Sequence, residues 1–137
     1  MKRRPGFTFI ELLMVMLFIS ALAALAVPRF RVYKTRAYIA SMQSDLANLR
    51  IAEESYWAEH QKYVTDTTAL DFRRTSQVQI TITSQNVIGG YTAVATHNNV
   101  PGQQCTTAMG AEAAPREPGR VFCGAASTGS GAIPATP

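Results

Sequence analysis

Residues 7–27 read FTFIELLMVMLFISALAALAV, and this stretch decides how the rest of the chain is organised. It contains one charged side chain, Glu11, and neither glycine nor proline. A helix of this length spans about 30 Å, the thickness of the hydrocarbon core of a bilayer. A basic hexapeptide that ends in Gly6 precedes the stretch, and Pro28 follows it. The sequence therefore predicts an apolar N-terminal helix whose role must account for both Gly6 and Glu11.

Bulk composition excludes little. The chain has 137 residues, enough for one domain with a modest core. A formal charge of +4 would suit nucleic acid, but three cations lie in the first six residues, and removing them lowers the charge to +1. The bulk charge of the shortened chain therefore says little about partners, and our expectation is no nucleic-acid binding by the chain itself.

Three kinds of N-terminal segment fit residues 1–27. A cleaved secretory signal would use the small-residue site Ala24-Leu25-Ala26, but the apolar run is longer than usual and carries a carboxylate. A plain single-pass membrane anchor explains the length of the apolar run, but it explains neither Gly6 nor Glu11. The third kind is cleaved after Gly6 on the cytoplasmic side, which leaves an apolar helix beginning at Phe7.

The charges on the two flanks do not settle the orientation of the helix, because the cations that follow the apolar run equal or outnumber those of the hexapeptide. They are Arg29, Arg31, Lys34 and Arg36. Aromatic residues lie between them, so a nucleic-acid patch is one interpretation, but lipid headgroups or another subunit suit this position better. The cysteines and the lack of a second apolar run favour an external C-terminal part.

The segment from Val32 to about Tyr63 keeps a helical period. Apolar side chains form one stripe, with charged residues expected on the other faces. The stripe comprises Tyr38, Met42, Leu46, Leu49 and Tyr56, and the charged residues are Asp45, Arg50, Glu54 and Glu59. An amphipathic half-helix needs a cover for its apolar face. We predict one long helix from Phe7 to this region.

The remaining sequence predicts a loop and four strands. The loop is Lys62–Gln77, and the strands are Val78–Thr83, Tyr91–Thr96, Gln104–Ala108 and Arg120–Cys123, with Val78, Ile80 and Ile82 pointing inward. Turns are expected at Asn86–Gly90 and Asn98–Gly102. We expect Gly124–Pro137 to form a flexible or O-glycosylatable tail. The predicted class is α+β, an antiparallel sheet laid over the C-terminal half of the helix.

Residues that could perform chemistry are sparse. Cys105 and Cys123 have no CxxC spacing, so they suggest one disulfide in an exported chain, or two free thiols in a reducing compartment. His60 and His97 are far apart in the sequence and suit surface or packing positions. We find no phosphate-binding loop, metal-ligand cluster or nucleophile elbow motif. We expect no enzymatic activity, no metal and no cofactor.

Gly6-Phe7-Thr8-Phe9-Ile10-Glu11 resembles the processing site of type IV prepilins, G-F-T-L-x-E, with Phe9 where leucine is commoner. The resemblance is dense over residues 1–36 and looser to about residue 63. It implies a type IVa pilin with the pilin fold, in which a long N-terminal helix packs by its C-terminal half against a small antiparallel sheet.

The resemblance also implies residue roles. A membrane aspartyl peptidase would cut after Gly6 and N-methylate Phe7, and Glu11 would pair with the terminal amine of a neighbouring subunit. A carboxylate in hydrocarbon costs about 2.5–3.5 kcal/mol, so it needs such a partner. Pro28 would kink or loosen the helix, and the loop at residues 62–77 would pack within the filament. A Cys105–Cys123 disulfide would join the third and fourth strands.

Three segments follow from the resemblance: a cleaved leader at residues 1–6, a transmembrane and filament-core helix at 7–27, and a globular pilin domain at 28–137. The precursor would cross the inner membrane once, then join a helical homo-oligomer, the surface pilus. Its other partners would be the prepilin peptidase and an assembly platform with a cytoplasmic ATPase. Filament functions include adhesion, twitching motility and DNA uptake.

Other identities stay open. A minor pilin or a type II secretion pseudopilin shares the N-terminal half, although major pseudopilins usually stabilise the C-terminal loop with calcium instead of a disulfide. An alternative from another class is a secreted or anchored binding domain with an ordinary signal sequence.

Overall fold

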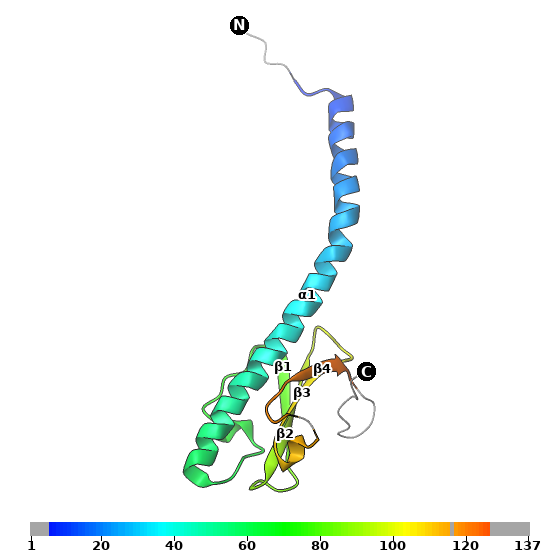
Figure 1. Cartoon of the computed structure of the whole chain (residues 1–137). Helices are drawn as coiled ribbons and strands as arrows, with labels where there is room; N and C mark the ends of the chain where they lie inside the picture. Colours follow the sequence, from blue (N-terminus) through cyan, green and yellow to red (C-terminus); the bar gives the residue numbers. More distant parts are fainter. Residues whose placement is uncertain (1–5, 116, 127–137) are drawn as a thin grey trace. The chain divides into compact units, whose positions relative to one another are not determined.

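A computed structural model describes residues 6–115 and 117–126 of the chain. A long helix, α1, precedes a four-stranded antiparallel sheet, which is the predicted α+β, pilin-like fold (Figure 1). In chain order the elements are α1 (Phe9–His60), η1 (Thr67–Ala69), β1 (Val78–Thr83), β2 (Gly90–His97), β3 (Gln103–Gly110), η2 (Ala111–Ala113) and β4 (Phe122–Ala125). The two η elements are single 3₁₀ turns.

Helix α1 runs through 52 residues, with Pro28 inside it. It ends at His60 because Gln61 has a left-handed φ of 55°, although the Gln61 N–H still donates to the Trp57 carbonyl at 2.8 Å. The predicted long helix is thus confirmed to within a turn at either end. The expected kink or loosening at Pro28 stays a prediction.

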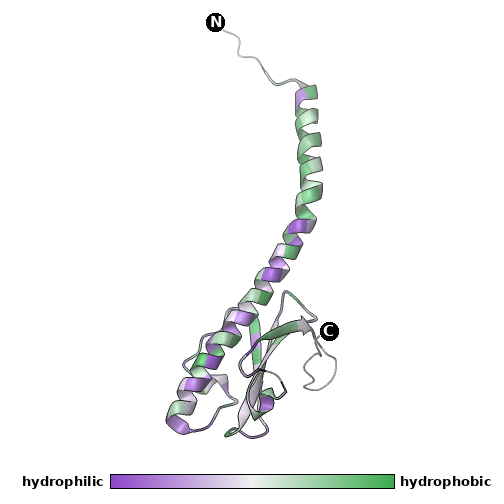
Figure 2. Ribbon diagram, in the orientation of Figure 1, coloured by the Kyte–Doolittle hydropathy of each residue, from purple (hydrophilic) through white to green (hydrophobic). Residues whose placement is uncertain are grey.

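The chain divides into two units, Met1–Thr35 and Arg36–Pro137. Figure 2 shows that the first half of α1 is almost uniformly hydrophobic, whereas polar and apolar residues alternate along the second half. This change of pattern indicates that the two halves of one helix face different surroundings.

The four strands follow one another in the sheet in sequence order, and every pair is antiparallel. The turn between β1 and β2 is closed by the Asn86 carbonyl, which accepts from the N–H groups of Gly89 and Gly90 at 2.8 and 3.1 Å. Gly110 ends β3 with a φ of 63°, and a Cβ there would collide with the carbonyl oxygen of Gly89. Only glycine suits this close approach of two backbones.

The core of the second unit lies between α1 and one face of the sheet. Met42, Leu46 and Leu49 of the predicted stripe are fully buried. They join a cluster that includes the strand residues Val78, Ile82, Tyr91, Ala93, Ala95 and Cys105, with Ile80 partly buried against it. The inward orientation predicted for the first strand is therefore confirmed.

Three details of the sequence prediction are wrong. Asp45 was expected on an outer face, but only 3% of it is exposed. It lies three residues after Met42 and four before Leu49, so the helical period places it within the buried stripe. The fourth strand begins at Phe122 instead of Arg120, because the Arg120 N–H donates to the Glu117 carbonyl at 3.4 Å and Arg120 therefore still belongs to the preceding turn. The expected tail begins too early, because Gly124 and Ala125 belong to β4 and pair with Gln104 and Gln103. Residues 127–137 of the expected tail lie outside the described residues.

Candidate assembly site

The apolar part of α1 is exposed along its whole length. Every residue from Phe7 to Val27 is classed as exposed, with Phe7 at 84% and Leu22 at 69%. Among the described residues, α1 is the helix that is long and apolar enough to cross a membrane, judged by length and composition. A contiguous apolar surface of this size in water marks a membrane or protein contact.

Thr8 and Glu11 cap the start of α1. The Glu11 N–H donates to the Thr8 hydroxyl at 3.3 Å, and one Glu11 oxygen accepts from the Thr8 N–H and hydroxyl, each at 3.4 Å. These reciprocal contacts form a capping box, and the carboxylate also lies where the helix dipole is positive. The pattern T-x-x-E before an apolar run could have identified this role of Thr8 from the sequence.

Gly6 lies just before this cap, in open surroundings. A Cβ built on Gly6 would meet no described atom within 4 Å. The fold therefore does not require glycine at this position, in contrast to Gly110.

The cations after the apolar run are exposed on α1. The ammonium group of Lys34 lies 5.0 Å from the centre of the Phe30 ring. This is a cation–π contact between residues one helical turn apart. Pro28 lies immediately before these residues, inside α1.

Two buried carboxylates tie α1 to the loop that follows it. Asp45 accepts from the Thr75 N–H at 2.7 Å and from the Thr75 hydroxyl at 2.9 Å. Glu53, which is fully buried, accepts from the Val64 N–H at 3.1 Å through one oxygen. Its other oxygen has no hydrogen-bond partner among the described residues. Both ties fix the path of the loop over residues 62–77, a role that charge alone did not predict.

The buried Glu53 carboxyl has a perturbed acidity. Burial raises its pKa to about 6, and the hydrogen bond from Val64 only partly opposes this. Burial and the nearby Glu53 charge also raise the pKa of the Tyr91 hydroxyl, which therefore stays protonated.

The histidines have packing roles. His97 is buried, its ring lies 4.5 Å from that of Tyr38, and its Nδ1 accepts from the Asn99 N–H at 3.1 Å. The ring of His60 stacks on Tyr56 at 4.1 Å, near the end of α1. Within residues 6–115 and 117–126, no group of three or more His, Cys, Asp or Glu side chains could hold a metal ion.

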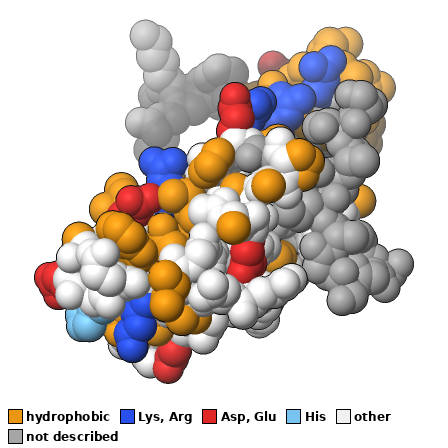
Figure 3. Space-filling view, turned by 60° about the horizontal axis from the view of Figure 1, so that its bottom comes forward, with side chains coloured by type: hydrophobic (Ala, Val, Ile, Leu, Met, Phe, Trp, Pro, Cys, Tyr) orange, Lys and Arg blue, Asp and Glu red, His pale blue; other side chains and the backbone are white. Residues whose placement is uncertain are grey.

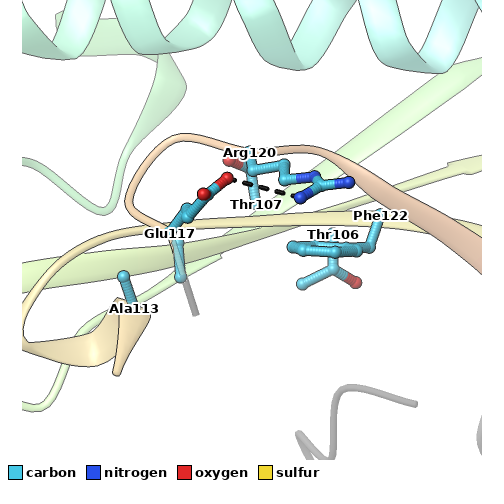
Figure 4. A pocket seen from close by; sticks show the side chains of 7 residues that line it. Thr106, Thr107, Ala113, Glu117, Arg120 and Phe122 are labelled. Atoms are coloured by element: carbon cyan, nitrogen blue, oxygen red, sulfur yellow. Dashed lines mark hydrogen bonds and ion pairs between the residues drawn. The ribbon is translucent and has the colours of Figure 1, made fainter. Parts of the chain in front are cut away.

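The pocket in Figure 4 lies on the face of the sheet that η2 and the segment before β4 cover. Its volume is about 10 Å³, room for roughly one water molecule. Arg120 forms an ion pair with Glu117 at 3.3 Å beside it and lies over the Phe122 ring at 5.2 Å. This pocket is too small for an organic substrate.

Cys105 and Cys123 are joined by a disulfide that links β3 to β4. The two residues face each other in the strand register, with their Cα atoms 4.0 Å apart. A closed loop of this size stabilises the folded chain by about 3 kcal/mol in the chain-entropy model.

Comparison with known proteins agrees with this architecture. No family model matches the chain. Two fimbrial proteins of Pseudomonas aeruginosa are each 34% identical to it over 95 residues, covering 59% of this chain and 62% of each relative. The type IV major pilin protein PilA of Myxococcus xanthus is 36% identical over 61 residues, covering 44% of this chain and 28% of that protein. The chain is therefore similar, over part of its length, to fimbrial proteins and to a type IV major pilin.

The relationship covers part of each protein. The chain spans 62% of the length of the fimbrial proteins that it matches. The partial match and the fold, with its long helix and antiparallel sheet, agree with the resemblance to the type IV pilins. The individual roles predicted for Gly6, Phe7, Glu11 and Pro28 remain proposals.

Proposed function

We propose that this chain is a structural subunit of a type IV pilus, cleaved after Gly6, N-methylated at Phe7 and polymerised into a helical surface filament. The observation that carries the proposal is the exposed apolar segment at residues 7–27, with one carboxylate one turn from its start. Such a surface needs lipid before assembly and neighbouring helices afterwards. The precursor would therefore lie in the inner membrane, and the assembled subunit outside the cell.

Glu11 suits a role in subunit register. Its two contacts with Thr8 are long, at 3.4 Å, so the carboxylate keeps capacity for a stronger partner. The terminal amine that cleavage creates at Phe7 of a neighbour would supply a charge-assisted hydrogen bond. In an apolar filament core an unpaired carboxylate is costly, so only registers that pair it would persist.

Gly6 suits recognition by a peptidase. Because the fold leaves open space around it, glycine at this position serves something other than folding. Close backbone approach in a narrow protease cleft supplies the reason. Residues 1–6 would then be the leader, and residues 28–137 the globular domain.

The partners in this proposal are copies of the chain, the prepilin peptidase and an inner-membrane platform with its ATPase. The chain itself would perform no catalysis. The relatives carry the names fimbrial protein and major pilin, which favours a pilin over a secretion pseudopilin.

The test is the mass and N-terminal sequence of the protein in filaments sheared from cells. We expect a chain that begins at N-methyl-Phe7. In a Gly6→Val variant, which the open surroundings tolerate, the uncleaved precursor should accumulate in the membrane. Glu11→Gln should abolish filaments, whereas the matched exposed variant Glu54→Gln should retain them. A mature chain that begins at Val27 would contradict the proposal.

A further inference from the structure

Positive charge is segregated on α1. Between Glu11 and Asp45 the sequence contains four cations and no acidic residue. All four, Arg29, Arg31, Lys34 and Arg36, are exposed. In the described part of the chain the ion pair is Arg120 with Glu117, so none of the four cations has a carboxylate partner there. Unpaired charge on this scale favours a partner that lies outside the folded chain.

Three of the residues in this segment form a ridge. Arg29, Tyr33 and Arg36 are spaced by four and three residues, so they share one face of the helix. Tyr33 is 62% exposed and lies between the two arginines in the order of residues along this face. We call these three residues the basic ridge. An aromatic ring flanked by arginines is a common composition at the centre of protein interfaces.

A groove with the complementary composition lies in the second unit, between the C-terminal half of α1 and residues 69–71. It encloses about 590 Å³, and neither lysine nor arginine lines it. Its walls include Ile51, Tyr56, Glu59, Leu70 and Asp71. We call it the acidic groove.

The acidic groove contains an exposed apolar side chain and carboxylates without an ion pair. Ile51 is 64% exposed, far more than Trp57, the other exposed large apolar side chain in this half of the helix, at 37%. Glu59 and Asp71 are exposed, and neither forms an ion pair among the described residues. Figure 3 shows hydrophobic side chains reaching the surface among charged ones on the lower face of the molecule.

We propose that the basic ridge of one copy docks in the acidic groove of a second copy in the filament. Tyr33 packs against Ile51, and the guanidinium groups of Arg29 and Arg36 bind the carboxylates of Glu59 and Asp71. The proposal rests on the proposed function, because it places the contact in the assembled filament. Ridge and groove are different surfaces, so each copy offers both, and the contact repeats without closing.

A second copy accounts for both surfaces, whereas anionic lipid accounts for the ridge alone. Lipid headgroups would bind the arginines, but they leave the exposed Ile51 and the two carboxylates of the acidic groove unpartnered. Protein–protein docking also removes Tyr33 and Ile51 from water together.

The first test is cross-linking in filaments of the full chain. Tyr33→Cys and Ile51→Cys chains are co-expressed, sheared from cells as filaments and mildly oxidised. We expect a covalent dimer, and a ladder of oligomers when both substitutions are in one chain. Pairing Tyr33→Cys with Thr81→Cys, an exposed position of β1, should leave the chain monomeric. Well-formed filaments without the Tyr33–Ile51 cross-link would overturn the docking while leaving the proposed function intact.

The second test is a charge exchange. Arg29→Glu with Arg36→Glu should reduce filament yield roughly tenfold or more, and so should Glu59→Arg with Asp71→Arg. Combining all four substitutions should restore most of the yield, with precursor in the membrane measured in parallel. If the arginine variants lose membrane retention and the exchange does not restore filaments, the ridge binds lipid and the docking is wrong. If the unsubstituted chain forms no filaments, the proposed function itself fails.

Discussion

At the residue scale, the two buried carboxylates of α1 differ in how many hydrogen-bond donors they have. Asp45 is satisfied by two donors from Thr75, whereas Glu53 has one donor for two oxygens. A buried acceptor without a partner costs about 1–3 kcal/mol. Glu53 is therefore a weak point in the packing of α1 against the loop that follows it.

Replacing Glu53 should stabilise the protein at neutral pH. Because its pKa is raised to about 6 in the folded state, the native state binds the proton more tightly than the unfolded chain. Stability therefore falls as the pH rises from about 4.5 to 6 and stays lower above that range. Glu53→Gln keeps an acceptor for the Val64 N–H, so we expect a gain of about 1–2 kcal/mol at pH 7.

The measurement is the free energy of unfolding of the full chain in detergent at several pH values. Glu53→Gln should flatten the pH dependence between about pH 4.5 and 6 as well as raise stability at pH 7. Glu54→Gln, on the exposed side of the same turn, is the matched control and should change neither. An unchanged pH profile in Glu53→Gln would show that this carboxyl does not titrate as described.

At the scale of elements, α1 has an apolar half without cover and an amphipathic half that the sheet covers. In the covered half the burial alternates sharply over short distances. Leu46 and Leu49 are fully buried, whereas Ile51, two residues later, is 64% exposed. Leucine and isoleucine have similar hydrophobicity. How much each of these residues stabilises the fold therefore depends on whether its face of the helix is buried.

Substitutions on the two faces should separate stability from assembly. Leu46→Ala removes a side chain from the closed core and should cost about 2–5 kcal/mol of unfolding free energy. Ile51→Ala should change it by less than about 0.5 kcal/mol, because the side chain is mostly in water. Denaturant unfolding measures both. A large loss in Ile51→Ala would show that this side chain already has a cover within the chain.

At the scale of the whole molecule, the folded core is confined to the second unit. The core cluster begins at Met42 and ends at Cys105, and residues 7–27 add no buried side chain to it. The disulfide and all four strands also lie in this unit. Residues 7–27 therefore contribute exposed apolar surface and no side chain of the core cluster.

A fragment of residues 29–137 should fold by itself. We expect it to be soluble and monomeric without detergent, with cooperative thermal unfolding by circular dichroism and a monomer mass by sedimentation. The full chain should need detergent or lipid, because its apolar residues are exposed. A fragment that is unfolded or strongly associated would show that residues 7–28 help to build the core.

Much of the fold could be predicted because local patterns and burial agree. The first strand, Val78–Thr83, was placed at its observed bounds, since strict alternation leaves one possible buried face. The predicted start of the fourth strand is wrong, because the Arg120 N–H bonds to the Glu117 carbonyl in the turn before the strand. The inward set Val78, Ile80 and Ile82 followed from the same period.

The features of the candidate site also divide into those that the sequence predicted and those that required the tertiary structure. By itself the sequence determined the long helix, its exposed apolar start, the α+β class and the resemblance at residues 6–11, because these depend on local order and periodicity. Only the tertiary structure decided that Asp45 and Glu53 are buried and that Glu59 and Asp71 border one groove. Such relations arise when segments distant in the sequence pack together, and no local pattern contains the position of a distant segment.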